Sequence, residues 1–260
     1  MEILGLGTGA AQVWLLFMLR TLGFVAVVPL FSARAAPPIF RIALVFLLTT
    51  IAFTAWAPRA TVPEAMLAVF VPAGVTELVL GLMLGFMTGM VFVAFQYAGQ
   101  FIGYQMGFAI VNVFDPHTQS QVSLIGEFLF TVVILAFLSL NLHHDFLRLW
   151  FMSYDIVPPG EYSLDQFSLN GLLAMCDDLM ILALKIAVPL LSFLMLTDLS
   201  LGIIARVMPQ MNVFIVGIPI KIAMGLIFLS LVVLQFDPVV RRVTMDFVND
   251  AGLLLKDLAS

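Results

Sequence analysis

The chain has 260 residues, of which 62% are hydrophobic and only 10% are charged. Ordinary soluble domains are about 45–50% apolar and about 25% charged, so this composition argues against a soluble enzyme. The net charge of −5 argues against a nucleic-acid partner, because nucleic-acid phosphates require a basic surface. A membrane protein is therefore the expected class.

Apolar stretches follow one another along the chain, each near or above the ~20 residues that cross a bilayer core. They cover residues 12–31, 39–57, 70–114, 123–142, 172–197 and 213–236. The alternation of a barrel strand is absent, so these stretches are predicted to be helices. The polar stretch 143–171, which opens with His143-His144-Asp145, is expected to begin as a solvated loop, and residues 237–260 are read as a tail.

The third apolar stretch is too long for a single straight span. It carries no charged residue between Glu77 and Asp115, and we expect it to break or bend in its glycine-rich part, around residues 99–107. Glycines recur in this stretch at four-residue spacing, which aligns them on one helix face and predicts close helix packing. They are Gly81, Gly85, Gly89, Gly99, Gly103 and Gly107.

Ionisable residues interrupt the apolar stretches, where each would cost about 2.5–3.5 kcal/mol at a helix centre unless it faces protein or water. They are Arg20, Glu77, Glu127, Lys185, Asp198, Arg206 and Lys221. Three explanations compete: a proton or ion relay, pairing between helices or subunits, and snorkelling at helix ends. Mixed signs and few histidines favour pairing, while the relay supports an alternative function as a stand-alone transporter or channel, with an ion path through Glu127, Lys185 and Asp198.

Amide side chains gather in the third stretch and just after it, among apolar neighbours. They are Gln96, Gln100, Gln105, Asn112, Gln119 and Gln121. Buried amides require partners, and a row of them beside Phe and Met side chains suits a narrow passage. The sequence shows neither the ligand spacing of a metal site nor a catalytic or nucleotide-binding motif, so we expect no enzyme activity, metal or cofactor.

Specific motifs are spread over most of the chain. They are Leu19-Arg20, Pro29 and residues 32–37; Glu77, Gly81 and Gly85; Ala98-Gly99-Gln100-Phe101-Ile102-Gly103-Tyr104-Gln105-Met106-Gly107; Asp115-Pro116; Pro189; Arg206-Val207-Met208-Pro209-Gln210-Met211-Asn212-Val213-Phe214; and Gly217 and Pro219. Together they resemble the FliR family of flagellar biosynthetic proteins and its type III secretion counterparts. The chain departs from the family pattern at Asn141-Leu142-His143, where members often have Asn-Gly-His.

The resemblance implies one export-gate subunit over residues 1–260, built from membrane-associated helical hairpins packed in a helical hetero-oligomer. Residues 1–170 would be FliP-like helices that include a pore plug, and residues 171–260 a FliQ-like hairpin with a tail. FliP-like and FliQ-like partners would form with it a closed, gated channel for unfolded export substrates. FlhB-like and FlhA-like components would be further partners, in the flagellar basal body at the bacterial inner membrane, and the middle motif favours a flagellar over a virulence system.

The resemblance also implies roles for particular residues. The plug or constriction would contain Met106, Phe108, Ile110, Val111, Phe114, Asp115 and Pro116. Polar contacts between subunits would involve Arg20, Glu77, Gln100, Gln105, Glu127, Arg206, Gln210 and Asn212.

Overall fold

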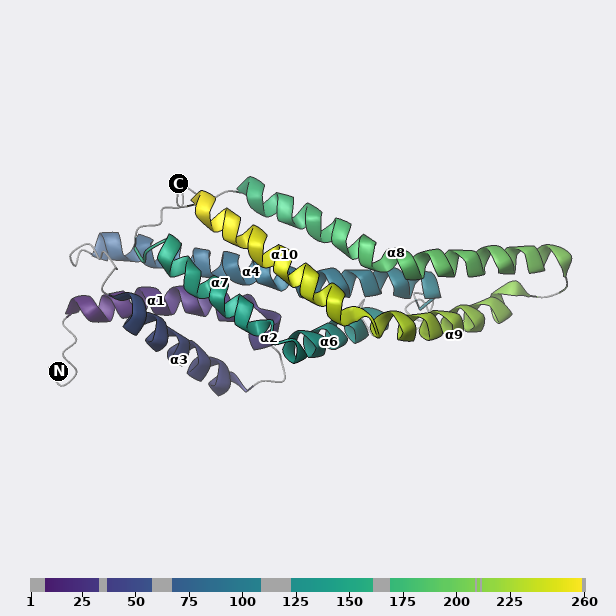
Figure 1. The fold of residues 1–260 in the computed structure, drawn as a ribbon, viewed down its shortest axis with the longest axis horizontal. Coiled ribbons are helices and arrows are strands. Elements are labelled where there is room, and N and C mark those ends of the chain that lie inside the picture. The colour runs from purple at the N-terminus through teal and green to yellow at the C-terminus, as the bar shows by residue number, and fades with distance from the viewer. Residues whose placement is uncertain are drawn as a thin grey trace. The chain divides into compact units, whose positions relative to one another are not determined.

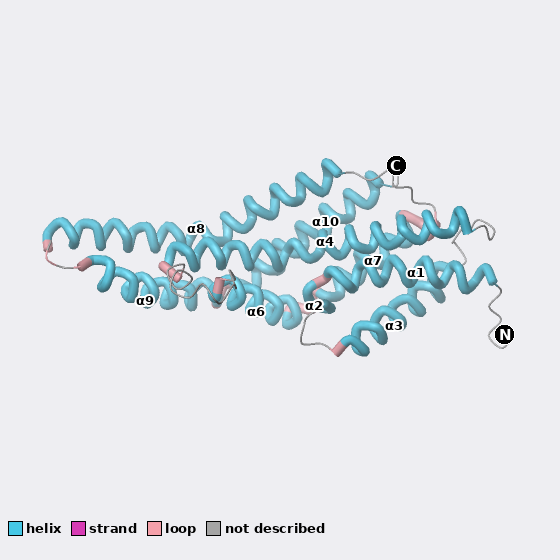
Figure 2. Tube along the Cα trace, turned by 180° about the vertical axis from the view of Figure 1, so that it is seen from behind, coloured by secondary structure: helices cyan, strands magenta, loops and turns pink. Residues whose placement is uncertain are grey.

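The computed structural model describes residues 8–32, 37–57, 67–108, 123–160, 169–208, 210 and 212–258, and all regular structure within these residues is helical (Figures 1 and 2). This confirms the predicted all-α fold. The helices are α1 (Thr8–Val27), α2 (Pro29–Ser32), α3 (Pro38–Trp56), α4 (Leu67–Met106), α6 (Leu124–Ser139), α7 (His143–Ile156), α8 (Leu169–Val207), α9 (Val213–Val233) and α10 (Phe236–Leu258).

Several of the described helices are long and apolar enough to cross a membrane. They are α1, α3, α4, α8 and α9, and the bent pair α6 and α7 adds a sixth if it is counted as one span. The predicted membrane protein is therefore confirmed by the lengths and composition of the helices themselves.

The chain divides into two compact units. Unit 1 contains Met1–Met90, Asn141–Met175 and Thr244–Ser260, and unit 2 contains Val91–Leu140 and Cys176–Val243. Helices α4, α8 and α10 contribute residues to both units.

Unit 1 is built around α1, which packs against α3, the first half of α4 and α7. Stacked rings dominate its core: the centroids of Phe17 and Tyr154 lie 4.8 Å apart, and those of Phe24 and Trp150 lie 6.2 Å apart. All four side chains are buried. These ring contacts join α1 directly to α7. Aromatic pairs of this kind stabilise a core by more than the area they bury would suggest.

Helix α7 corrects the expected loop at residue 143. Residues 143–156 form an amphipathic helix, in which the side chains of Phe146, Leu149, Trp150 and Tyr154 are buried. These positions recur at spacings of three and four residues, which is the signature of one helix face. Because charged residues lie between these positions, the overall composition of the segment does not reveal its apolar face. The expected tail is likewise helical, because residues 236–258 form α10.

Unit 2 combines the second half of α4 with α6, and also contains the hairpin of α8 and α9. Phe92 of α4 meets Phe137 of α6 edge to face, with ring centroids 5.1 Å apart. In the hairpin, Phe193 stacks on Phe228 with ring centroids 4.5 Å apart. Figures 1 and 2 show α8 and α9 running side by side in opposite directions.

Helix α4 ends in a glycine cap. The N–H of Gly107 donates to the carbonyl of Tyr104, and the N–H of Phe108 donates to the carbonyl of Gly103, each at 3.1 Å. With Gly107 at a φ of 93°, this is the Schellman arrangement that satisfies the last carbonyls of a helix. The expected break around residues 99–107 therefore falls at the last glycine, and the helix continues through Gly99 and Gly103.

Candidate functional site

A buried ion pair joins α1 to α4 in unit 1. The side chains of Arg20 and Glu77 are both fully buried. Nε of Arg20 donates to Oε2 of Glu77 at 2.6 Å, and Nη2 donates to Oε1 at 3.0 Å, so the contact is bidentate. Pairing of this kind lets two charges remain ionised away from water. The predicted role of Arg20 and Glu77 in contacts between subunits is corrected, because they pair between helices of the same chain.

Groups of α7 and of the turn after it complete the surroundings of this pair. Nη1 of Arg20 donates to the carbonyl oxygens of Ser153 and Val157, each at 3.0 Å. The N–H of Gly160 donates to Oε1 of Glu77 at 3.0 Å. The ion pair and these partners, here called the Arg20 cluster, therefore fix three helices of unit 1 together.

The two charges are evident from the sequence, but their partners on α7 are not. Tyr154 is the clearest omission, because the guanidinium carbon of Arg20 lies 4.5 Å from the centroid of its ring, within range of a cation–π contact. Backbone carbonyls such as those of Ser153 and Val157 leave no signal in a sequence. The amphipathic spacing of residues 146–154 could have placed Tyr154 on a buried helix face.

The first glycine run lies where α1 crosses α4. A Cβ at Gly81 would clash with the carbonyl oxygen of Arg20 and lie 2.9 Å from its carbonyl carbon. At Gly85 a Cβ would lie 2.7 Å from the carbonyl oxygen of Phe24, whereas at Gly89 the nearest atom, Cδ of Pro29, would be 3.5 Å away. Gly81 and Gly85 therefore permit backbone contact between the helices, and Gly89 has room for a side chain.

Replacing Gly81 by Ala is expected to lower stability by about 1–3 kcal/mol, because the added methyl group must push apart two backbones that cannot rotate away. Gly252→Ala is the matched control, since a Cβ at that helical position has no atom within 4 Å. Alanine in place of an unhindered helical glycine gains up to about 1 kcal/mol. Thermal unfolding of the detergent-purified protein measures both, and equal midpoints for the two variants would contradict the close approach of α1 and α4.

The second glycine run approaches α6 in unit 2. A Cβ at Gly99 would lie 2.7 Å from the carbonyl oxygen of Ile125 and from Cα of Gly126. At Gly103 a Cβ would clash with Oγ of Ser123, the residue that caps α6. These two glycines bring the end of α4 against the start of α6.

Two of the predicted polar residues have partners beside this contact. Nε2 of Gln96 donates to Oε1 of Glu127 at 2.8 Å, which links α4 to α6. Nε2 of Gln100 donates to the hydroxyl of Tyr104 at 3.0 Å on the same helix. The amides of α4 are thus paired within the chain, as buried or membrane-embedded polar groups require.

A polar cluster surrounds the last turn of α4. Nε2 of Gln105 donates to Oδ2 of Asp198 at 2.9 Å, and Oδ1 of the same carboxylate pairs with Nζ of Lys221. Asp198 therefore joins α4 to both helices of the hairpin. Lys221 balances the charge of Asp198, so neither of these two charges inside candidate spans is left without a counter-charge.

Met106 extends this cluster with an apolar contact. Its side chain is fully buried and lies directly on the backbone of α9, since a Cβ at Gly225 would be 2.7–2.9 Å from three of its atoms. Gly107 lies near Ile218, whose Cγ2 would be 3.8 Å from an added Cβ. We call Gln105, Met106, Asp198, Lys221 and Gly225 the α4-end cluster. This cluster fixes the end of α4, where the predicted plug segment begins.

The alternative ion path is not assembled in the described residues. Glu127 is bound by Gln96, and Asp198 is bound by Lys221 and Gln105. Lys185 lies on the same helix as Asp198, thirteen residues earlier in the chain, which places it about 20 Å away along the axis. These three residues therefore do not form a continuous relay.

The remaining predicted residues lie at the periphery or outside the described residues. Arg206, Gln210 and Asn212 are exposed at the tip of the α8–α9 hairpin. Phe108 is half-buried just after the α4 cap. The plug positions Ile110, Val111, Phe114, Asp115 and Pro116 lie outside the residues that the structure describes. Within the described part, no group of acidic, His and Cys side chains could hold a metal ion.

The described residues define an all-helical membrane protein in which Arg20 pairs with Glu77, and Asp198 with Lys221, inside candidate spans. Residues 11–247 match the family described as bacterial export proteins, family 1, and the chain belongs to this family. It is 38% identical over 240 residues to flagellar biosynthetic protein FliR of Bacillus subtilis, a match that covers 88% of this chain and 89% of the relative.

More distant relatives cover most of the chain as well. FliR of Escherichia coli is 25% identical over 244 residues, with 94% of this chain and 91% of the relative aligned. Yop proteins translocation protein T of Yersinia pestis is 27% identical over 183 residues, with 70% and 67% aligned. The chain is therefore a membrane-embedded component of the flagellar and type III export class, a transport family rather than a known enzyme family.

Proposed function

We propose that the chain is a subunit of the flagellar type III export gate and forms, with FliP-like and FliQ-like subunits, a closed channel for unfolded export substrates. The relatives named FliR support the flagellar assignment, and 38% identity to one of them is the highest of the values above. FlhB-like and FlhA-like components complete the proposed set of partners. The proposed location is the basal body at the bacterial inner membrane.

The observation that carries this proposal is the apolar length of α8. Its candidate span, Leu173–Val207, has 35 residues, or about 52 Å, whereas a bilayer core is about 30 Å thick. The chain itself buries only 28% of this span, compared with 72% of the 37-residue span of α4. Neither lipid nor this chain covers the whole of α8, so we infer that other protein subunits do.

The proposed function also divides the chain into two parts. Residues 1–170 would be the FliP-like part with the plug, and residues 171–260 the FliQ-like hairpin with its tail. The antiparallel packing of α8 and α9, fixed by the Phe193–Phe228 stack and the Asp198–Lys221 pair, supports the proposal of a hairpin. Only 17% of the candidate span in α9 is buried by the chain, which leaves it a large surface for neighbours.

The α4-end cluster supports the proposed position of the plug. It anchors the last turn of α4 to both helices of the hairpin, and the glycine cap at Gly107 ends the helix there. A segment that starts from a fixed point can be held across a passage with a small loss of conformational entropy. We therefore place the seal between Met106 and Gln119, with energy for export supplied by other components.

Co-expression with the FliP-like and FliQ-like proteins of the same organism is expected to yield a hetero-complex, detected by native mass spectrometry of the tagged chain. Leu199→Trp is the test variant, because Leu199 is 62% exposed on α8 and lipid would accept a larger apolar side chain. Protein packed against it would not, at a cost of about 1–3 kcal/mol. Partner recovery should therefore fall.

Leu253→Trp is the control, because Leu253 is similarly exposed, at 59%, but lies on α10, outside the candidate spans. It should leave partner recovery unchanged. A stable, monodisperse single chain that never copurifies with these partners would reject the gate subunit and favour a transporter that works alone.

A further inference from the structure

A pocket of about 630 Å³ opens between α8 and the junction of α9 with α10, entirely within unit 2. Its walls are mainly apolar, with Ile186 and Pro189 on one side and Phe228, Leu231 and Val232 on the other. Its size and lining are typical of sites for small organic molecules, which combine apolar walls with a few polar groups that orient the ligand.

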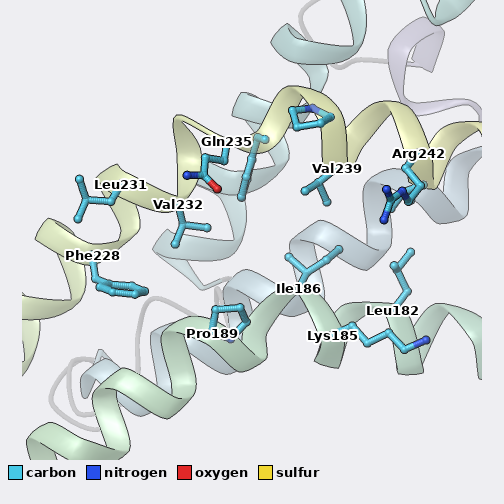
Figure 3. Close-up of a pocket in the computed structure, with 13 residues that line it drawn as sticks. Leu182, Lys185, Ile186, Pro189, Phe228, Leu231, Val232, Gln235, Val239 and Arg242 are labelled. Atoms are coloured by element: carbon cyan, nitrogen blue, oxygen red, sulfur yellow. The ribbon is translucent and has the colours of Figure 1, made fainter.

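Two basic side chains line the same pocket. They are Lys185 of α8 and Arg242 of α10, and Figure 3 shows both at one end, with Phe228 and Leu231 at the other. Both are exposed, and no carboxylate of the described residues lies within ion-pair distance of either. In a chain with a net charge of −5, a pair of unmatched cations at a pocket mouth is a specific feature that favours an anionic ligand.

The register of the hairpin shows which residues lie opposite the basic end of the pocket. The contacts Asp198–Lys221 and Phe193–Phe228 run antiparallel, and continuing them by eight residues places Lys185 opposite Phe236, just after the candidate span of α9 ends at Val233. From Ile186 to the end of α8 at Val207 the helix is about 33 Å long. A helix of this length is long enough to cross one bilayer core of about 30 Å, which would set the two cations at the level of the lipid headgroups.

We propose that this pocket binds an anionic glycerophospholipid, with its phosphate between Lys185 and Arg242 and an acyl chain along Ile186, Pro189 and Phe228. Basic pockets between membrane helices at the headgroup level bind lipids of this kind. The apolar walls exclude free phosphate as the main ligand, because most of the contact area would remain empty. The amphipathic helix α10, which carries Arg242, is not itself a candidate span.

Lipid binding is measured by native mass spectrometry and thermal shift on the purified protein, alone and in complex with its partners. Phosphatidylglycerol is compared with phosphatidylethanolamine, and inorganic phosphate serves as the headgroup-only probe. Phosphatidylglycerol is expected to bind and to raise the unfolding temperature, while the other two have little effect. Lys185→Gln and Arg242→Gln should each weaken binding of phosphatidylglycerol about fivefold, which corresponds to the binding free energy that one basic residue contributes near a membrane surface.

Arg241→Gln is the matched control, because Arg241 is exposed beside Arg242 on α10 and does not line the pocket. It should leave binding unchanged. Equal effects of the Arg241 and Arg242 variants, or equal binding of both lipids, would overturn the proposal. So would binding by the single chain that disappears in the complex, since a partner subunit would then occupy the pocket. Each of these readouts is independent of whether the assembled gate conducts.

Discussion

Glu77→Gln is expected to destabilise the protein by about 3–5 kcal/mol, because it leaves the guanidinium of Arg20 buried without a counter-charge. The two side chains have no solvent exposure and share two hydrogen bonds. Groups of α1, α4 and α7 and of the turn after α7 surround the pair, which keeps both side chains from water. The measurement is the thermal or denaturant unfolding of the detergent-purified protein, alone or in its complex.

The double variant Arg20→Met, Glu77→Leu measures the net contribution of the ion pair to stability, separately from the cost of leaving one charge unpaired. Apolar replacement of both partners removes the unpaired charge, so the loss should be clearly smaller than for Glu77→Gln alone. Some loss remains, because the carbonyls of Ser153 and Val157 lose their donor.

Arg148→Gln is the control for charge removal as such. Arg148 pairs with Asp145 at 3.5 Å on α7 and is 78% exposed, and exposed pairs of this kind contribute about 0–1 kcal/mol. If Glu77→Gln were as mild as Arg148→Gln, the Arg20 cluster would not hold unit 1 together.

Deleting residues 110–116 is expected to raise the leak of ions and small solutes through the assembled gate, which is our second large effect. The deletion removes the proposed apolar seal just after the fixed end of α4, and apolar constrictions block ions by excluding water. Permeability is measured by solute flux in cells, or in vesicles that contain the purified complex.

Two further variants make the leak assay specific. Replacing residues 110–116 by Gly and Ser keeps the length and removes the apolar side chains, so it should leak as well. The same replacement of residues 161–167, in the connection before α8, should remain closed. Unchanged permeability after the deletion, with the complex still assembled, would reject the plug assignment.

The sequence predicts that certain residues need partners or pack closely, but it does not predict which residues they meet. Arg20 and Glu77 were recognised as charges that require partners, because hydrocarbon leaves an isolated charge no alternative. Their pairing with each other was not predicted, since they lie 57 residues apart and no spacing rule connects two different helices. Gly81 and Gly85 were recognised as sites of close packing, but the sequence contains no sign that α1 is the helix they meet.

The sequence by itself determined the all-helical membrane class and the family, because apolar length and specific motifs are local properties of the chain. It also indicated a break within residues 99–107, and α4 ends there at Gly107, where only glycine readily adopts the required backbone conformation. Only the tertiary structure decided which charges neutralise each other and that Lys185 and Arg242 share one pocket. Those outcomes depend on contacts between residues far apart in the chain, which packing selects and local sequence does not encode.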